Sequence, residues 1–449
     1  MTPTASGVLV RETGKISRDR SVNAGVRAML SRQGEMGGRE TAELAGIAVV
    51  PEARRRLERA LTYHWREQTR KTGKTVFVDE LVVGCGLHAA IYCGSRVAQG
   101  HEPPMAVGDA PGGIFAASER PSWYLNSRNR NGRNLPPLEA GGLNHVPGSG
   151  VQLAHVSMEK FHTNADLRYV IRTLLARAAR VHVDAVADWV SGNYPGGYRY
   201  RAITERGRTV FARRTVDARG IQPVVAVGGG AGVLSFTDLM RLADEPFPLR
   251  GMGRVAVIGN GDSGKCAVEM LLGSGPPGHM SVAALDWVRQ VDLFGGPRTP
   301  TTVEDWRAVE RGRYQAIGSY LRPLQNGEQR LRTFQQVARH VRTLGGVLVN
   351  DRFYDQVVLC TGAGLSPSLP GLDEYMGEAS PWPSGDGVTK VARKRDEVLA
   401  VGPRARLELT NAEVSQGLTR RPGLDVGLFR LGDRTASAAV RLQRPTPAP

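Results

Sequence analysis

The chain has 449 residues, a hydrophobic content of 41% and a formal net charge of +16 at pH 7, so we expect two or three domains with sizeable cores and a basic surface. The basic residues are spread along the chain and are not gathered with stacking aromatics, which favours attraction of anionic cofactors over binding of nucleic acid. No apolar run approaches the ~18 residues that span a membrane, and the N-terminus has no apolar signal-peptide core, so we expect a cytoplasmic protein that makes no membrane contact.

The cysteines and histidines do not form a metal-binding or redox pattern. The four cysteines show no C-x-x-C spacing, and the histidines show neither H-x-H nor H-E-x-x-H. We therefore expect small buried thiols and no metal site. The four cysteines are Cys85, Cys93, Cys266 and Cys360.

Residues 1–75 form a polar, arginine-rich extension without a clear strand. Within it a helix is predicted for Pro51–Arg70, because Leu57, Leu61 and Trp65 recur every four residues. The extension could pack against the body of the protein, contact a second copy in a homo-oligomer, or cover a cofactor.

A first nucleotide-binding unit begins near Val76. The apolar run Leu81–Val83 leads into Gly84-Cys85-Gly86-Leu87-His88-Ala89, a G-x-G-x-x-A pattern followed by a predicted helix. This strand, glycine turn and helix are typical of a dinucleotide site, with Gly84, Gly86 and Ala89 as its fingerprint positions. An acidic residue after the next strand, predicted near Pro104–Val107, would bind the ribose, and Asp109 is the nearest candidate.

Beyond this strand come Pro111-Gly112-Gly113-Ile114-Phe115 and a polar stretch that contains Asn126. Here the chain resembles the two-dinucleotide flavoproteins, and within them the NAD(P)H-dependent flavin monooxygenases, in which a P-G-G-x-[WF] element runs beside the flavin. The resemblance implies that Gly112 and Gly113 line FAD. It also places Asn126, the candidate catalytic residue, near the isoalloxazine ring, although an ordinary turn residue is an equally good interpretation of this asparagine.

A helix is predicted from Thr163 or Asn164 to about Ala179, and a strand follows at Val181–Val183. In the resembling family this strand holds the adenine through backbone groups, which would fall on Val183. The neighbouring His182 is expected on the outer surface of the strand. A β-hairpin is then predicted from Tyr198 to Val216, with a glycine turn.

A second glycine turn follows the apolar run Val255–Ile258. Gly259 permits the turn, Gly261 lets a pyrophosphate approach the backbone, and Gly264 lets the following helix pack closely, while Ser263 stands in the same turn as a further predicted contact. The N-terminus of that helix offers N–H groups to a phosphate. Two such motifs about 175 residues apart predict two dinucleotides, usually FAD and a nicotinamide nucleotide.

The second turn also satisfies the spacing of a nucleotide-hydrolase P-loop. Gly259, Gly264 and Lys265 match G-x-x-x-x-G-K, but Cys266 stands where a serine or threonine must bind magnesium. A hydrolase is therefore disfavoured.

The next strand of this unit ends at Asp286-Trp287-Val288-Arg289. An acid at this end would select NADH, whereas an arginine would accept the 2′-phosphate of NADPH. We predict NADPH through Arg289, with NADH as the alternative through Asp286. Further along, a helix is predicted at Leu331–Leu344, stopped by two glycines.

Two later segments also resemble the flavoproteins. Residues 355–362 are similar to the family's D-x-V-V-x-A-T-G strand, with Cys360 in place of alanine, and the resemblance implies a return to the FAD domain with Gly362 as a contact. Residues 398–403 resemble the strand that brings backbone N–H groups to the FAD ribitol and pyrophosphate. Its predicted contact is Gly402, and Pro403 replaces the aspartate of many relatives.

These interpretations combine into an α/β fold with two Rossmann-like dinucleotide-binding domains, the NAD(P) domain inserted in the FAD domain. The predicted ranges are 1–75 for the extension, 76–245 and 355–449 for the FAD domain, and 246–354 for the NAD(P)H domain.

The resemblance implies a monooxygenase that uses O₂ and NADPH to hydroxylate a small molecule, an amine nitrogen being favoured, through a C4a-hydroperoxyflavin. No cysteine pair suggests a disulfide reductase, and the Baeyer–Villiger fingerprint is absent. Two alternatives stay open: an NAD(P)H dehydrogenase that passes electrons to a quinone or other carrier, and a nucleotide-binding scaffold without turnover.

Overall fold

The computed structural model of the protein describes residues 50–98, 100–119, 124–128, 161–223, 232–242, 253–259, 262–272, 282–289, 330–336, 338, 340–343, 345–361, 363–365, 368–377, 380–383, 390–394 and 398–404. Within these ranges no helix is both long and apolar enough to cross a membrane.

The first of two large sheets contains nine strands. They are β1 (Thr75–Val83), β2 (Met105–Val107), β5 (Arg180–His182), β6 (Val186–Tyr194), β7 (Tyr198–Thr204), β8 (Thr209–Asp217), β19 (Ser380–Pro383), β20 (Lys390–Lys394) and β21 (Val398–Ala400). The hydrogen-bonded order is β19-β20-β21-β8-β1-β2-β5, with β6 and β7 joined to it through β8. The five strands from β21 to β5 run parallel, so their carboxyl ends share one edge.

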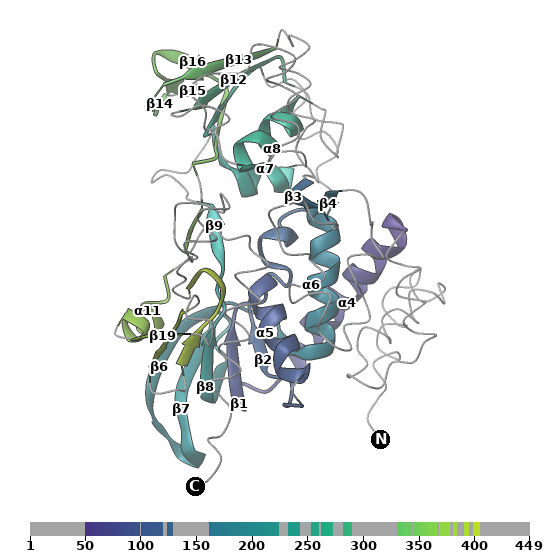
Figure 1. The fold of residues 1–449 in the computed structure, drawn as a ribbon, viewed down its shortest axis with the longest axis vertical. Helices are drawn as coiled ribbons and strands as arrows, with labels where there is room; N and C mark the ends of the chain where they lie inside the picture. Colours follow the sequence, from purple (N-terminus) through teal and green to yellow (C-terminus); the bar gives the residue numbers. More distant parts are fainter. Residues whose placement is uncertain are drawn as a thin grey trace.

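Three helices cover one face of this sheet (Figure 1). They are α4 (Pro51–Lys71), α5 (Leu87–Ala98) and α6 (Asn164–Ala178). The apolar face predicted for α4 is confirmed, because Leu57, Leu61 and Trp65 are all buried in the main core. Thr163 begins α6 with a capping box: its Oγ1 accepts the N–H of Asp166 at 3.3 Å, and its own N–H donates to Asp166 Oδ2 at 2.7 Å.

The other face of the first sheet carries a separate apolar cluster. Side chains along β1 alternate, so Val82 faces the helices, whereas Leu81 and Val83 pack with Trp189 of β6 and Tyr200 of β7. The short helix α11 (Pro370–Gly377) lies beside β6 and adds Leu372 to this cluster.

The second sheet has five parallel strands. They are β10 (Val233–Ser235), β11 (Arg254–Ile258), β12 (Ala284–Arg289), β13 (Leu331–Gln335) and β17 (Gln356–Leu359), in the order β10-β17-β11-β12-β13. Helices α7 (Phe236–Leu242) and α8 (Asp262–Leu271) contact its strands, and Leu285 and Trp287 share their core cluster. Val288 and Ile258 instead pack with an antiparallel sheet of β14 (His340–Thr343), β15 (Gly346–Val349) and β16 (Arg352–Tyr354).

Two predictions fail in this region. The helix predicted at Leu331–Leu344 is wrong: the segment forms β13 and β14, because Leu331 pairs with Leu285 and the chain continues along β12. The strand at residues 356–359 was expected to return the chain to the first sheet, but β17 pairs with β11 in the second. Together with β10, it extends the second sheet beyond the predicted range 246–354 on both sides.

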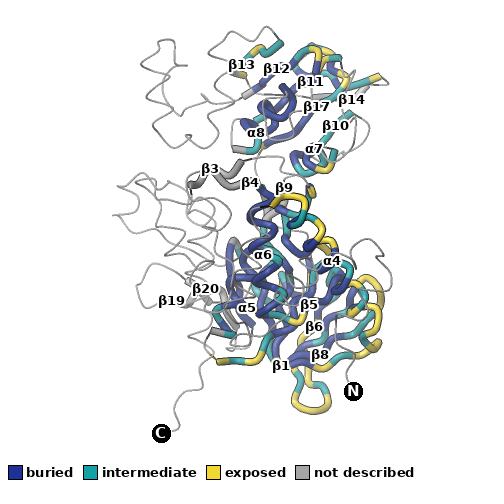
Figure 2. The backbone as a smooth tube through the Cα atoms, turned by 90° about the vertical axis from the view of Figure 1, so that its right-hand side faces the viewer, coloured by how far each residue is buried: buried dark blue, intermediate teal, exposed yellow. Residues whose placement is uncertain are grey.

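The chain crosses between the two sheets along paired segments. β9 (Ile221–Pro223) leaves the first sheet, β18 (Ala363–Leu365) follows the second, and the two pair antiparallel. Figure 1 shows β9 between the two bodies. In Figure 2 the buried backbone follows α5 and α6 in one body, and α8, β11 and β17 in the other.

Three short helical turns and one small sheet complete the described structure. The turns are η2 (Gly113–Ala116), η4 (Pro195–Gly197) and η6 (Gly402–Arg404), and the sheet pairs β3 (Tyr124–Arg128) with β4 (Phe161–Thr163).

Candidate functional site

The two glycine turns have the same backbone geometry. Gly84 follows β1 and Gly259 follows β11, and both adopt φ +121°, a value that side chains rarely allow. Each N–H donates to the end of the next parallel strand, Gly84 to Val107 at 2.8 Å and Gly259 to Val288 at 2.9 Å. The chain therefore leaves the strand with the same backbone geometry at both turns, and in each case it enters a helix.

Both turns also lie where the strand order reverses. β1 leads through α5 to β2 on one side, while β8 lies on its other side, and β11 lies likewise between β12 and β17. Ligands of open parallel sheets bind in the crevice at such a reversal. A Cβ on Gly84 would lie 2.6 Å from the carbonyl oxygen of Ala218, just after β8, and one on Gly259 would overlap the carbonyl oxygen of Cys360, just after β17. Only bare backbone fits at either position.

At the first turn, three backbone segments that are distant in sequence converge. The N–H of Gly112 donates to Cys85 at 2.8 Å, and a Cβ on Gly113 would lie 3.0 Å from the Cα of Gly86. Gly402 adopts φ +69° after β21, and a Cβ there would overlap the ring of His88. The structure thus brings together Gly84, Gly86, Gly112, Gly113 and Gly402, five of the predicted FAD contacts.

Asp109 lies exposed beyond the end of β2, close to the same turn. Burial raises the pKa of the Cys85 thiol, and the carboxylate of Asp109 raises that pKa further, which places this charge near Cys85. Gly108, which the sequence pattern did not single out, packs tightly here: a Cβ on it would lie 3.0 Å from the nitrogen of Cys85. Its position one residue before Asp109 is the signal that could have found it.

The end of β5 differs from what the sequence suggested. The N–H of Val183 donates to Thr69 Oγ1 of α4 at 2.8 Å, so this group is already satisfied within the protein. The prediction that backbone groups of Val183 bind an adenine can therefore apply only to its carbonyl oxygen. The expectation that His182 lies on the surface is wrong, because its side chain faces the protein interior and the residue is 1% exposed.

In the second turn, the helix packs directly onto the glycine backbone. A Cβ on Gly264 would overlap the carbonyl oxygen of Gly259, which explains the glycine at this position. The same carbonyl accepts the indole N–H of Trp287 at 2.7 Å, a contact that the sequence pattern did not indicate. Ser263 lies in the first turn of α8, and Ala89 lies buried in the first turn of the corresponding helix α5.

Asp286 is a structural residue and not the ribose-binding acid of an NADH site. It lies within β12 opposite Ala256, fully buried, and accepts bonds from Arg332 at 2.7 and 2.6 Å and from the hydroxyl of Tyr354 at 2.7 Å. The residue that ends β12 is Arg289, one position beyond Val288, which pairs with Ile258 beside the glycine turn. The position predicted for a 2′-phosphate contact is therefore at the carboxyl edge.

The position of Lys265 argues against the nucleotide-hydrolase alternative. A P-loop lysine must reach bound phosphates, but Lys265 is 1% exposed and belongs to the core side of α8. All four cysteines are buried thiols, as expected, and none forms a disulfide. Asn126 belongs to β3, but its side chain lies outside the described structure, as do Gly261, Gly362 and the side chain of Arg289. Their roles stay predictions.

No family model and no curated protein matches this chain. Among solved structures, a FAD-bound cadaverine monooxygenase from Erwinia amylovora is similar at TM-score 0.55 and 11% identity, covering 82% of this chain and 94% of the other. An ornithine N-hydroxylase from a Kutzneria species, with reduced FAD, NADP⁺ and L-ornithine, is similar at 0.52 and 16%, covering 82% and 99%. An L-lysine 6-monooxygenase from Pseudomonas syringae is similar at 0.50 and 17%, covering 82% and 100%. The chain therefore has the two-domain Rossmann-like fold of these proteins.

Proposed function

We propose that this chain is a FAD-dependent NADPH oxidoreductase that uses O₂ to hydroxylate an amine nitrogen of a small molecule. The observation that carries the proposal is the pair of equivalent glycine turns. Gly84 and Gly259 share φ +121° and lie at the strand-order reversals of two separate parallel sheets, which gives one chain two dinucleotide cradles.

The first cradle fits FAD. Gly84 and Gly86 offer bare backbone and the N-terminus of α5 to a pyrophosphate. In this proposal Asp109, beyond the end of β2, binds the adenosine ribose, and Gly402 follows β21 into the same region. Gly112 and Gly113 adjoin this turn, where close packing against Gly86, Ala116 and Arg168 leaves no room for a side chain.

The second cradle fits NADPH. Gly259, Ser263 and Gly264 form the turn at the start of α8, and Gly261 belongs to the same segment. Because Asp286 is buried and occupied by Arg332 and Tyr354, it does not repel a 2′-phosphate, and Arg289 at the end of β12 offers a positive charge to it.

The reaction class follows from the fold and from the cysteines. The similar proteins are named as hydroxylases or monooxygenases of ornithine, lysine and cadaverine, all of which are amines. A disulfide reductase needs a cysteine pair at the flavin, and the four cysteines here are all buried and show no C-x-x-C spacing. When bound, FAD supplies hydride acceptance and the activation of O₂, while the chain supplies binding, orientation and exclusion of water.

Purified protein tests the proposal directly. We expect a yellow protein, or an apoprotein that takes up one equivalent of FAD, whose flavin is bleached by NADPH without air. Under air, NADPH and O₂ consumption should rise together with an amine such as ornithine, lysine or cadaverine, and a hydroxylamine should be found as product. Rapid reduction of a quinone without any hydroxylamine would instead support a carrier reductase, and failure to bind FAD would sink both.

A further inference from the structure

The loop from Pro111 to Glu119 forms one wall of the first cradle. It begins at Pro111, passes through Gly113, which packs against Gly86, and continues through η2 to Glu119. Its backbone bonds include those from Gly112 to Cys85 at 2.8 Å, from Gly113 to Ala110 at 2.7 Å and from Ala117 to Ile114 at 3.2 Å.

Two arginines of α6 bind both ends of this loop. Arg172 Nε donates to the carbonyl of Pro111 at 2.9 Å, at the beginning. Arg168 donates from Nη1 to the carbonyl of Ser118 and from Nη2 to that of Glu119 at 2.8 Å, at the end. A Cβ on Gly112 would lie 3.2 Å from the Cγ of Arg168, so the stem of this arginine also packs against Gly112.

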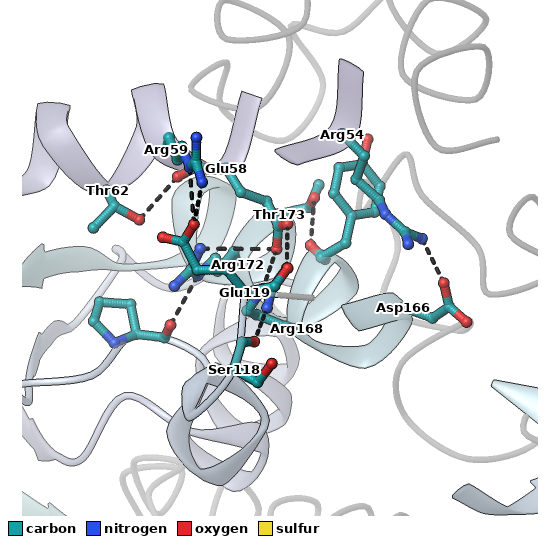
Figure 3. Close-up of polar contacts among 12 residues, drawn as sticks. Arg54, Glu58, Arg59, Thr62, Ser118, Glu119, Asp166, Arg168, Arg172 and Thr173 are labelled. Atoms are coloured by element: carbon teal, nitrogen blue, oxygen red, sulfur yellow. Dashed lines mark hydrogen bonds and ion pairs between the residues drawn. The ribbon is translucent and has the colours of Figure 1, made fainter. Parts of the chain in front are cut away.

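Both arginines contact one buried carboxylate, and it comes from the N-terminal extension. Glu58 of α4 accepts two bonds from Arg168, at 2.9 and 2.9 Å, and lies 3.8 Å from Arg172 Nη1. Glu58 and Arg168 are each 1% exposed. Figure 3 shows Glu58 of α4 bonded to both arginines, Ser118 bonded to Arg168, and the carboxylate of Glu119 bonded to Arg59 of the same helix.

Because both arginines are largely buried, their charges depend strongly on the carboxylate of Glu58. Burial lowers the pKa of Arg172 to about 10, which still leaves its guanidinium group charged at neutral pH. Without Glu58, the two buried guanidinium groups would lose their buried partner and keep only the half-exposed carboxylate of Glu119 nearby, and breaking a buried pair in this way is strongly destabilising. The loop carbonyls would then lose their donors.

A second buried ion pair joins the same helices without touching the loop. Arg54 of α4 binds Asp166 of α6 at 2.5 Å, with both side chains largely buried. Arg54 and Glu58 are one helical turn apart, so the two pairs are matched in location and chemistry. Of these two buried pairs, only the one at Glu58 connects to the loop, whose end also receives a bond from the exposed Arg59 to the carboxylate of Glu119 at 2.6 Å.

We propose that Glu58 is a positioning residue for the flavin: through Arg168 and Arg172 it holds the Pro111–Glu119 loop against the first glycine turn. The helix that precedes the first strand is thereby part of the FAD site and not an appendage. This inference rests on the proposed function, because it takes the ligand of the first cradle to be FAD.

The test compares Glu58→Gln with the matched control Arg54→Gln. We expect Glu58→Gln to raise the FAD dissociation constant of the apoprotein about tenfold, within the range that coupling between contacting groups spans. It should also change the visible circular dichroism of bound flavin and speed hydrogen exchange at the amides of Gly112, Gly113 and Ala117 without FAD. Arg54→Gln should lower the melting temperature, but leave FAD affinity within about twofold and the exchange unchanged.

Two milder variants keep the test decisive if Glu58→Gln does not fold. Glu58→Asp keeps the charge and should show an intermediate change in FAD affinity. Arg172→Lys keeps the charge but loses the bond to Pro111, and should weaken FAD and speed exchange at Gly112. Equal FAD affinity and equal exchange in the Glu58 and Arg54 variants would overturn the inference. A wild-type protein that binds no FAD would overturn the proposed function instead, while the exchange data would still show whether Glu58 holds the loop.

Discussion

Trp287 donates its indole N–H to the carbonyl oxygen of Gly259 at 2.7 Å, so a buried side chain of β12 binds the backbone of the second glycine turn. Replacing Trp287 with phenylalanine keeps most of the buried apolar area but leaves that carbonyl without this donor. We expect a loss of about 1–3 kcal/mol in unfolding free energy, and weaker NADP⁺ binding by calorimetry with FAD affinity unchanged.

Trp189 provides the matched control for this change. Its indole N–H donates to Thr215 Oγ1 at 3.2 Å in the first sheet, away from both glycine turns. Trp189→Phe should lower stability without altering NADP⁺ affinity. If both variants bind NADP⁺ equally well, the bond from Trp287 does not shape the cradle.

The first glycine of each turn, Gly84 or Gly259, should control the binding of one cofactor and not the other. In Gly84→Ala the new methyl would meet the carbonyl of Ala218, and in Gly259→Ala that of Cys360, each at φ +121°. We expect Gly84→Ala to abolish FAD binding, and Gly259→Ala to abolish NADPH binding while FAD stays bound. Flavin absorbance after desalting and NADP⁺ titration measure the two effects.

Gly207→Ala separates backbone strain from contact. Gly207 also has a positive φ, +74°, but a Cβ there would meet nothing within 4 Å. This variant should lose about 1 kcal/mol of unfolding free energy and bind both cofactors normally. Loss of both cofactors in Gly259→Ala would contradict the assignment of separate cradles.

Asp286 and Arg289 should behave differently although they lie on the same strand. Asp286→Asn weakens the bonds to Arg332 and Tyr354, so we expect about 1–3 kcal/mol of destabilisation and an unchanged preference for NADPH over NADH. Arg289→Ala should lower that preference about tenfold, the effect of losing about 1.4 kcal/mol of contact with a 2′-phosphate. The ratio of kcat/KM for the two coenzymes decides. A switch toward NADPH in Asp286→Asn would restore the ribose-binding interpretation of this acid.

Two buried histidines predict a loss of stability in mild acid. Burial lowers the pKa of His182, Arg208 and Arg206 lower it further, and Asp184 opposes them; burial and Lys71 lower the pKa of His64. Because the unfolded chain takes up protons near pH 6.5 before the folded one does, stability is complete above this pH and falls below it, by at most about 1.4 kcal/mol per pH unit for each group. Urea unfolding between pH 7 and pH 5 should show this fall, and His182→Gln should reduce it. A parallel curve for the variant would exclude His182 as a source.

The sequence pattern predicted the elements in which local chemistry and tertiary role coincide. Glycines at 84 and 259 follow apolar runs and precede helical periods, so their turns were readable from the chain alone. The α4 helix was predicted from its apolar spacing, and the start of α6 from Thr163. The close approach of Gly113 to Gly86 was not predicted: the family resemblance implied only that Gly112 and Gly113 line FAD, and nothing in the spacing brings Gly86 and Gly113 together.

The misses share one physical cause, which is that the partner of a residue lies far away in sequence. From the sequence alone Asp286 resembles a ligand-binding acid, but in the structure its carboxylate accepts bonds from Arg332 and Tyr354. The strand at 356–359 is apolar in any sheet, and only its pairing with β11 assigns it to the second. Glu58 sits in a polar, arginine-rich helix where solvent exposure is the ordinary expectation, and its burial depends on Arg168, 110 positions along the chain.

The pairing of β9 with β18 makes the second body removable in principle. Pro223 and Ala363 are cross-strand partners in an antiparallel ladder, so the ends left by excising residues 224–362 already stand side by side. A two-residue reverse turn is enough to join such ends. The shortened polypeptide would keep the first parallel sheet whole, and the excised portion could be exchanged for that of another protein without altering how the remaining strands are threaded.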